Sequence, residues 1–350
     1  MTSTPRAILS DQHCHEWSAF ASKATSGVNS RLQLILDEMR RAAQELLAAG
    51  GRQMIFAGDL FHTRGSIAPS VFNPTHDTVS EITRMGVEII AIPGNHDLES
   101  KESERLGSAI TTLEEIAGFR VIQGPTMVDD MILAPWMSSV AALRDAIGAF
   151  SAPARAACDL IIHAPVNGVL IGIPDHGFDA AELADFGFRR VFSGHYHNHK
   201  DLGRGVYSIG ATTHQTWSDI GTKAGFLLVN EGRVDFRASQ APKFIEIDET
   251  TPEEELPLIV DGNYVRVRLP SVTAVEERTL RETLRDLGAL GVIINAARKT
   301  ESARPSGTIA AGASLNTSTA DFVKMLGSPR EPRLLALCDD ILNEAKGLEA

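Results

Sequence analysis

The sequence has few features that would tie the chain together covalently or place it in a membrane. Its three cysteines, Cys14, Cys158 and Cys338, lie far apart and form no C-x-x-C pair, which excludes a disulfide framework and a structural zinc knuckle. No run of about 18 apolar residues could span a bilayer, and the apolar run Ala7 to Leu9 is too short for a signal-peptide core. We therefore expect no membrane partner and a cytoplasmic location, in a cell or, for a phage protein, in its host.

Positive charge is also scarce. The 350 residues include 33 Lys and Arg against 45 Asp and Glu, which gives a net charge of −12. Non-specific binding of nucleic acid depends on Lys and Arg replacing counterions along the phosphate backbone, so any phosphate substrate must be held locally. The 43% hydrophobic content excludes disorder for the bulk of the chain. What stands out instead is 11 histidines, a residue type that binds metals and transfers protons.

Short apolar runs alternate with amphipathic stretches in the first third of the chain, which predicts a β-α-β-α-β order. The predicted strands are residues 7–11, 53–59 and 87–92, and the predicted helices are residues 30–49 and about 75–85. Two later runs, 159–163 and 190–195, each end in a histidine. Ligands of open α/β sheets bind at the carboxyl ends of the strands, so polar residues at these positions are candidates for a site.

The rest of the chain predicts a closing β-meander and a smaller unit. The runs 206–209, 225–229 and 233–236 are typical of a meander that closes the first domain near residue 240. A small α/β unit is predicted from strands at 244–247, 264–269 and 291–296 and a helix near 274–287.

This pattern predicts a division into domains. We expect a main domain at residues 1–242, a small α/β cap at 243–300, a flexible Ser, Gly, Ala and Thr-rich linker at 301–318, and C-terminal helices at 319–350. The last helix has an apolar stripe that either docks on its own domain or packs in a groove of a partner: Leu334, Leu337, Cys338, Ile341 and Leu342.

Five separated clusters carry the candidate chemistry. They are Asp11-x-His13, Gly58-Asp59-x-x-His62, Gly94-Asn95-His96-Asp97, His163 and Gly194-His195-x-His197. Each cluster alone is compatible with a cap or an ordinary polar residue, but together they favour a catalytic metal pair. Carboxylate, imidazole and amide donors suit Mn, Fe, Zn or Mg, and a carboxylate can bridge two ions about 3.5 to 4 Å apart for in-line displacement at phosphorus.

In this order the clusters resemble the motifs D-x-H, G-D-x-x, G-N-H-D/E, H and G-H-x-H of the calcineurin-like metallophosphoesterase superfamily, across residues 11 to 197. The resemblance implies an α/β fold of four layers: a β-sandwich of two sheets flanked by helices, here with a small α/β cap and C-terminal helices. It implies two divalent ions, one held by Asp11, His13, Asp59 and His197 and the other by Asp59, Asn95, His163 and His195. His96 is then expected to contact the scissile phosphate and protonate the leaving oxygen, with Asp97 orienting its ring.

Within the superfamily the chain is similar to SbcD-type nucleases of DNA break repair and to phage recombination endonuclease subunits. The similarity is carried by Gly58-Asp-Leu-Phe-His62, by Tyr207-Ser-Ile-Gly210 and by Lys223 to Val229. It implies that His62 contacts the substrate phosphate and that DNA is the substrate. It further implies Mn²⁺ as the ion, with Mg²⁺, Fe²⁺ and Zn²⁺ as alternatives, and an SbcC-type coiled-coil ATPase bound by the C-terminal helices; a homodimer is also compatible.

The chain departs from this branch at two places. Cys14-His15 stands where the branch has Leu-Gly, and Ala211-Thr-Thr-His214 lacks its Ser-Pro, so His15 and His214 are either substrate contacts or loop residues. Residues 262–304 hold eight Lys or Arg against five acids, which suits either a basic cap that steers DNA or a solvated helix face. A phosphoesterase of small phosphodiesters or phosphomonoesters, and an inactive DNA-binding scaffold, remain the alternative functions.

Overall fold

The computed structural model describes residues 4–100, 108–170, 172, 176–230, 232–299 and 314–347. The chain divides into two units, one of Met1–Pro270 with Glu276–Ala296 and one of Ser271–Val275 with Ala297–Ala350. The boundary predicted after residue 242 lies within the first unit, and residues 301–313 of the predicted linker lie outside the described residues. The domain plan therefore stays a prediction.

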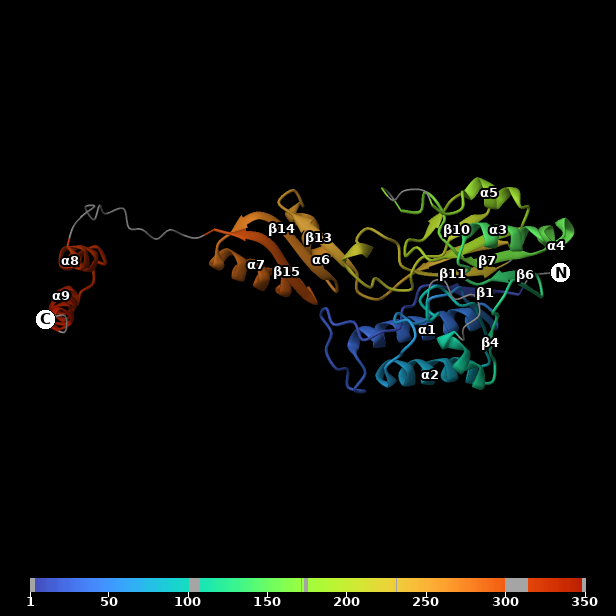
Figure 1. Cartoon of the computed structure of the whole chain (residues 1–350), viewed down its shortest axis with the longest axis horizontal. Helices are drawn as coiled ribbons and strands as arrows, with labels where there is room; N and C mark the ends of the chain where they lie inside the picture. Colours follow the sequence, from blue (N-terminus) through green and yellow to red (C-terminus); the bar gives the residue numbers. More distant parts are fainter. Residues whose placement is uncertain are drawn as a thin grey trace. The chain divides into compact units, whose positions relative to one another are not determined.

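Two six-stranded sheets form most of the first unit (Figure 1). The first, in the order β12-β11-β1-β2-β3-β4, has four parallel strands and an antiparallel hairpin: β1 (Arg6–Leu9), β2 (Gln53–Phe56), β3 (Glu88–Ala91), β4 (Phe119–Val121), β11 (Gly225–Asn230) and β12 (Arg233–Ala238). The second, in the order β5-β6-β7-β8-β10-β9, has four parallel strands between two antiparallel ones: β5 (Thr126–Val128), β6 (Met131–Ala134), β7 (Asp159–His163), β8 (Arg190–Gly194), β9 (Lys200–Asp201) and β10 (Val206–Ser208).

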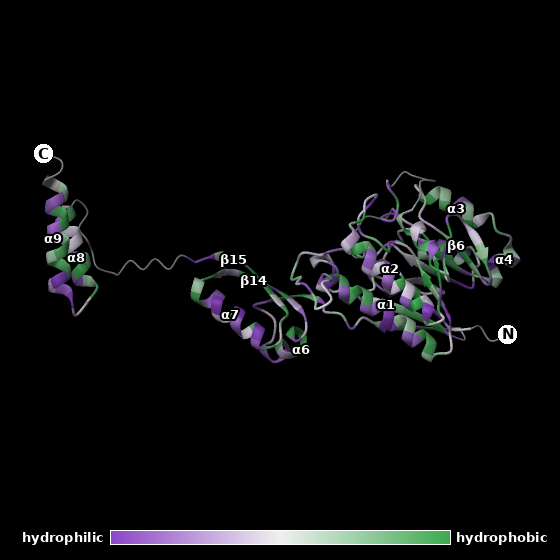
Figure 2. Cartoon of the chain, turned by 90° about the horizontal axis from the view of Figure 1, so that it is seen from below, coloured by the Kyte–Doolittle hydropathy of each residue, from purple (hydrophilic) through white to green (hydrophobic). Residues whose placement is uncertain are grey.

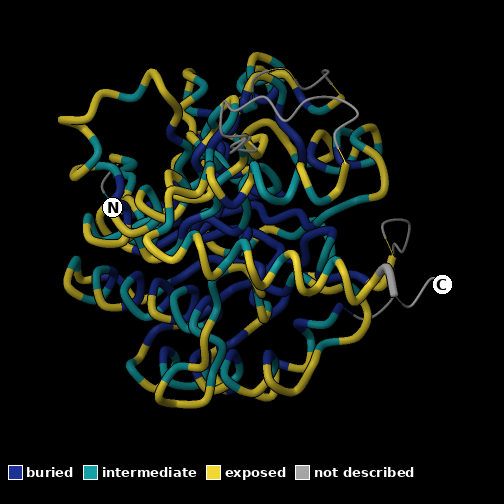
Figure 3. The backbone as a smooth tube through the Cα atoms, turned by 90° about the vertical axis from the view of Figure 1, so that its left-hand side faces the viewer, coloured by how far each residue is buried: buried dark blue, intermediate teal, exposed yellow. Residues whose placement is uncertain are grey.

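The strands alternate between two cores, as the period of two in a strand requires. Ile8, Ile55 and Ile161 pack between the two sheets, whereas the neighbouring Leu9 and Phe56 face helices. On the outside lie α1 (Ser30–Ala48), α2 (Pro69–Arg84) and η1 (Ala109–Glu115) over one sheet, and α3 (Val140–Gly148), α4 (Ala152–Ala157) and α5 (Ala180–Asp185) over the other (Figure 1). Figure 3 shows the buried strands at the centre and exposed residues on the outer helices. The predicted four-layer α/β fold is confirmed.

The two helices of the first layer show how the sequence places them. The side chain of Asn29 accepts the backbone N–H groups of Arg31 and Leu32 and so caps α1. Helix α2 begins at Pro69, earlier than predicted, because a proline in the first helical turn loses no hydrogen bond. The apolar stripe of α1, which includes Leu32, Ile35 and Met39, is buried as the pattern predicts.

The predicted small α/β elements are confirmed. Most of their residues belong to the first unit, whereas the end of β14, the start of α7 and the end of β15 belong to the second. A three-stranded sheet of β13 (Phe244–Asp248), β14 (Tyr264–Val272) and β15 (Gly291–Arg298) is accompanied by η3 (Glu253–Glu255), α6 (Leu256–Val260) and α7 (Ala274–Asp286). The positive charge here is partly neutralised, because Arg266 and Arg268 both pair with Glu246.

The predicted meander is wrong. Strand β10 pairs in parallel with β8 of the second sheet, whereas the hairpin of β11 and β12 pairs with β1 of the first. The short helix η2 (Trp217–Asp219) lies between them in the chain. Neighbours in sequence thus belong to different sheets.

In the second unit, α8 (Leu315–Met325) packs against α9 (Glu331–Gly347). Ser314 caps α8 through the N–H of Thr317, so this helix begins before residue 319, the predicted start of the C-terminal helices. Figure 2 shows hydrophobic segments on both helices. Among the described residues no helix has the length and apolar character needed to cross a bilayer.

Candidate metal centre

The polar clusters meet where the parallel strands end. They come from the loops after β1, β2 and β3 in the first sheet and from the ends of β7 and β8 in the second: Asp11, His13, Asp59, Asn95, His163, His195 and His197. The carboxyl ends of parallel strands lie at one edge of a sheet, and the two sheets present these edges together. The structure therefore gathers side chains that are far apart in the sequence.

The carboxylate of Asp59 lies between histidines of the two sheets. Its Oδ2 is 3.5 Å from Nε2 of His13 and 3.4 Å from Nε2 of His163. The amide oxygen of Asn95 is 3.2 Å from the same nitrogen of His163 and 2.9 Å from Nδ1 of His195. Oxygen and imidazole donors thus converge on both sides of one carboxylate.

Asp11 is the second buried carboxylate of the centre. Its Oδ2 accepts the backbone N–H of His195 at 3.0 Å, whereas its buried Oδ1 has no hydrogen-bond partner in the described part of the chain. Ring nitrogens of His13 and His197 lie within 4.8 Å of an Asp11 oxygen. A carboxylate oxygen buried in this way costs free energy unless a cation or donor binds it.

The backbone is strained where it presents these side chains. Asp11, His13, Asp59 and His195 have φ angles of 51°, 47°, 57° and 103°, a region that residues other than glycine rarely adopt. At Gly94 a Cβ atom would clash with Oδ1 of Asp59, so the close approach requires glycine. Such strain persists only where the surrounding structure holds it, and it concentrates at functional sites.

Further hydrogen bonds orient two of the histidines. Nδ1 of His163 donates to the carbonyl of Ala57 at 2.8 Å, and Nδ1 of His197 donates to the carboxylate of Asp219 at 2.9 Å. Each neutral ring then presents an unprotonated Nε2 to the centre, which is the form that binds a metal.

Histidines alone balance the charge of the two carboxylates. Among the described residues, Asp11 and Asp59 form ion pairs with His13 and His163 and none with Lys or Arg. Burial raises the pKa of Asp11. Burial would lower the pKa of His163, but the neighbouring Asp59 raises it to about 9. Without a bound cation, protonated imidazole supplies the positive charge.

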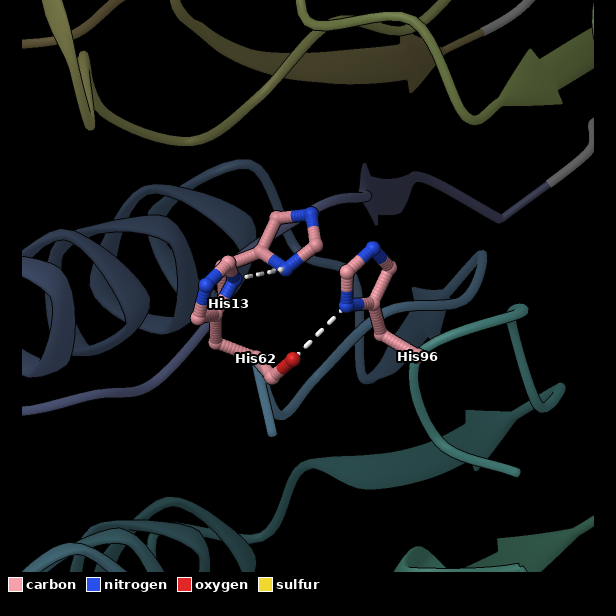
Figure 4. A group of neighbouring side chains, drawn as sticks. All are labelled: His13, His62 and His96. Carbon is pink, nitrogen blue, oxygen red and sulfur yellow. Dashed lines mark hydrogen bonds between the residues drawn. The ribbon is translucent and has the colours of Figure 1, made fainter. Parts of the chain in front are cut away.

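His13, His62 and His96 form a third group beside the carboxylates (Figure 4). Nδ1 of His62 lies 3.3 Å from Nδ1 of His13, and Nδ1 of His96 donates to the backbone carbonyl of His62 at 2.7 Å. The loop after β2 therefore orients the ring of His96. His96 is half-buried, and its Nε2 takes no part in that hydrogen bond.

Asp97 has a different set of partners from the expected one. Within the described residues its carboxylate does not bond to the ring of His96 but accepts backbone N–H groups of the loops after β2 and β3, at 2.8 to 3.4 Å: Asp59, Leu60, Phe61 and Gly94. Backbone N–H groups that point inward from a loop form a nest for an anion. Asp97 thus holds the loops that present Asp59 and His96.

Sequence motifs do not mark three side chains around the centre. Asp219 orients His197, Nε2 of Gln215 donates to the carbonyl of Asp11 at 2.7 Å, and the ring of Trp136 lies 5.2 Å from that of His195. The spacing of Thr216 and Asp219 is a capping-box pattern, which predicts only the start of a helix.

The structure separates the two histidines whose roles the sequence left open. Nδ1 of His214 accepts the N–H of Phe244 at 3.1 Å and its Nε2 bonds to the carbonyl of Thr222 at 3.0 Å, so both ring nitrogens serve the fold. His15 is half-buried, with its ring 5.0 Å from that of His62.

The donor set fits a pair of divalent metal ions. Carboxylate, imidazole and amide oxygens are present without cysteine, and the unpartnered Oδ1 of Asp11 is an oxygen that a cation would satisfy. The fold and these donors define an α/β protein with a candidate dinuclear metal site.

The comparison with protein families agrees with this assignment. The model of the calcineurin-like phosphoesterase family matches residues 5–199, and the chain therefore belongs to that family, whose members use a dinuclear metal site. The resemblance inferred from the motifs is confirmed.

Individual relatives are distant. The chain is 26% identical over 201 residues to exonuclease subunit 1 of Enterobacteria phage T4. The alignment covers 55% of this chain and 56% of that protein, so the match spans about half the length of the relative. Among solved structures, nuclease MPE of Pseudomonas putida has 16% identity and a TM-score of 0.31 over 65% of this chain and 86% of that one. A dimetal phosphatase of Danio rerio has 9% identity and a TM-score of 0.40 over 66% and 93%.

Proposed function

We propose that this protein is a two-metal-dependent nuclease that hydrolyses phosphodiester bonds of DNA during break processing and recombination. The observation that carries the proposal is the position of the Asp59 carboxylate between His13 and His163. Asp59 would be a ligand of both divalent ions. One ion would also be held by Asp11, His13 and His197, and the other by Asn95, His163 and His195.

The residues beside the metals have distinct proposed parts. Bound cations would activate water and neutralise charge on the phosphoryl oxygens. His96 would donate a proton from Nε2 to the leaving oxygen, because its Nδ1 is held by the carbonyl of His62. The ring of His62 would contact the phosphate, and Asp97 would keep both loops in place.

DNA as the substrate has three supports. The motif from Gly58 to His62 resembles that of SbcD-type nucleases, and the relative from phage T4 is named as an exonuclease subunit. Arg278 and Arg285 of α7 are exposed and available to phosphates. Mn²⁺ is the proposed ion, by analogy with the same branch.

The C-terminal helices are the proposed site for an SbcC-type coiled-coil ATPase. Large apolar side chains stay exposed although α8 and α9 pack on each other: Leu315, Phe322, Leu326, Leu337 and Ile341. An amphipathic helix with an uncovered apolar face commonly lies in a groove of a partner.

Hydrolysis by the full chain tests the function. With Mn²⁺ we expect cleavage of linear duplex DNA and of bis-p-nitrophenyl phosphate, and a loss of roughly a hundredfold or more in kcat for His96→Asn. His76→Asn, on the partly exposed side of α2, is the matched control and should keep wild-type rates. Activity on small esters without cleavage of DNA would favour a small-substrate phosphoesterase, and inactivity of both proteins on every ester would favour a scaffold.

Truncation tests the partner. A chain ending at residue 299 lacks α8 and α9. It keeps the contacts between Arg31 and the small sheet, in which the rings of Phe244 and Tyr264 lie 4.9 and 5.1 Å from the guanidinium. We expect unchanged hydrolysis of bis-p-nitrophenyl phosphate and loss of ATP-stimulated DNA cleavage with the ATPase. Full stimulation of the truncated chain would place the partner surface elsewhere.

A further inference from the structure

The loops after β1 and β2 run side by side beyond the edge of the sheet. The N–H of Cys14 donates to the carbonyl of Leu60 at 2.8 Å, and the N–H of His62 donates to the carbonyl of Cys14 at 3.4 Å. This pairing leads the chain from His13 directly to His15 and Trp17. A group bound at His13 and His62 therefore has these two side chains as neighbours.

The rings of His15, Trp17 and His62 form one aromatic cluster. Their centroids are 4.5 Å apart for Trp17 and His62, 5.0 Å for His15 and His62, and 5.2 Å for His15 and Trp17. The indole N–H of Trp17 donates to the carbonyl of His13 at 3.3 Å, which ties the ring to the metal centre. Both His15 and Trp17 are only half-buried, so the cluster offers aromatic surface to a ligand.

A hollow of about 270 Å³ adjoins the cluster. Its lining includes the buried apolar residues Cys14, Phe61 and Val71, and polar atoms come from His15, Glu16, Thr63 and Ser66. Its volume is sufficient for a flat heteroaromatic ring. The hollow thus combines apolar and aromatic surface with hydrogen-bonding groups.

We propose that this hollow binds the nucleobase next to the scissile phosphodiester. The ring of His15, which lines the hollow, stacks against the base, and Trp17 supports that ring edge to face. The inference depends on the proposed nuclease function and adds the part of the substrate that is recognised besides phosphate. Every base has π-faces, so stacking on aromatic side chains tolerates sequence. The hydroxyls of Thr63 and Ser66 suit the polar edge of a base.

Proximity to the metal centre selects a base over other ligands, because His15 lines the hollow and its ring lies 5.0 Å from that of His62. The base is covalently joined to the phosphate that His62 and His96 would contact, so both subsites fill in one binding event. A lipid chain would leave the polar groups of Thr63 and Ser66 unpaired, and a sugar would make little use of the aromatic wall.

Three chromogenic phosphodiesters test the subsite on the full chain with Mn²⁺. They are the p-nitrophenyl esters of thymidine 5′-phosphate and thymidine 3′-phosphate, and methyl p-nitrophenyl phosphate, which has no base. We expect one thymidine ester to exceed the methyl ester in kcat/KM by about tenfold or more, mainly through KM. His15→Ala should remove this preference and leave the methyl ester at the wild-type rate. Trp17→Leu should weaken the preference, whereas Trp17→Phe should retain it.

A binding measurement removes the dependence on catalysis. With metal chelated, saturation-transfer NMR should show the base protons of thymidine 5′-phosphate in contact with the wild-type chain, and these signals should weaken in His15→Ala. Phe322→Ala removes an exposed aromatic ring of α8 and is the matched control, which should behave as wild type. His15→Ala also decides the matter if Trp17→Leu lowers the melting temperature, because His15 is half-exposed.

The outcomes separate the two proposals. Equal kcat/KM for all three esters, unchanged in the variants, together with no base contacts by NMR, would overturn the nucleobase subsite and leave the nuclease function standing. Failure to hydrolyse any ester or DNA would overturn the function, and loss of the base signals in His15→Ala would then still support a base-binding hollow.

Discussion

The parallel strands carry buried carboxylates at both ends, and the two ends balance them differently. At the beginning of β7, both oxygens of Asp159 accept hydrogen bonds from Arg189 and Arg190. Asp130, just before β6, pairs with Arg189 and with Arg6 of β1, so this network joins the two sheets. Guanidinium groups of the chain itself balance the buried charge there.

At the other end the chain supplies no such balance. Asp11 and Asp59 are 0% and 2% exposed and Asp159 is 3% exposed, so burial does not distinguish the two ends. The difference lies in the partners, since Asp11 and Asp59 have only histidines as ion-pair partners in the described chain. A carboxylate paired with arginine serves stability, whereas one left without a fixed cation is available to a metal.

The largest expected effect is the loss of catalysis at the uncompensated end. Asp59→Asn removes the carboxylate proposed to bridge two ions, and we expect kcat for bis-p-nitrophenyl phosphate with Mn²⁺ to fall by about a thousandfold, or roughly 4 kcal/mol. Calorimetry with metal chelated should show that the variant still unfolds cooperatively, so that the loss of activity is not a loss of folding. Retained activity would contradict the role of Asp59.

At the end where arginines balance the carboxylates, around Asp159, we expect a substitution to lower the stability of the fold instead. Asp159→Asn leaves Arg189 and the buried Arg190 without their shared carboxylate, and breaking such a buried pair costs about 3 kcal/mol. Urea unfolding of the metal-free chain measures this change, while the activity of the folded fraction should stay at the wild-type level. A stable but inactive variant would reverse the comparison.

Added metal should stabilise the protein only through the end of the strands that carries Asp11 and Asp59. At a concentration 100 times the Kd, Mn²⁺ is expected to raise the free energy of unfolding by about 2.7 kcal/mol. The shift in Tm should persist in Asp159→Asn and disappear in Asp59→Asn. Equal shifts in both variants would show that the metal binds elsewhere.

A smaller effect is expected at the partner of His197. Asp219→Asn loses the carboxylate that accepts the Nδ1 proton of His197, and loss of such a contact commonly lowers metal affinity or activity by about 10- to 100-fold. Isothermal titration with Mn²⁺ checks the affinity. Asp235→Asn, on strand β12, is the control.

The smallest effect is a pH dependence at the compensated end. Burial would raise the pKa of Asp130, but Arg6 and Arg189 lower it to about 2. The ionised carboxylate therefore favours the folded state above the unfolded pKa of about 3.9, and this contribution is lost as the pH falls through 2. The difference in Tm between wild type and Asp130→Asn should be constant at neutral pH and shrink below pH 4.

Local patterns predicted the strands that carry the motifs and the helices α1, α2 and α7. They did not predict the short strands β4, β5, β6 and β9 or the helices α3, α4 and α5. Long-range pairing accounts for the misplaced meander. The stripe of α1 and the strand ends at Asp11 and Asp59 follow from periodicity and short motifs. The position of β10 was wrong because parallel pairing with β8 depends on hydrogen bonds between separate parts of the chain, which no local pattern contains. The partners of Asp97 are backbone N–H groups of two loops, which become neighbours only when β2 and β3 pair.

The family and the chemistry of the donors follow from the amino-acid order, because residue types such as Asp11, Asn95 and His163 in a fixed order are local properties. Which carboxylates receive an arginine, and which nitrogens face the centre, depends on folding. Arg6 and Asp130 are 124 residues apart, and packing of the two sheets makes them partners. The same packing leaves Oδ1 of Asp11 without a hydrogen-bond partner in the described structure. Among the described residues the guanidinium of Arg64 reaches this edge, but it donates to the backbone carbonyl of Asn95 and not to a carboxylate.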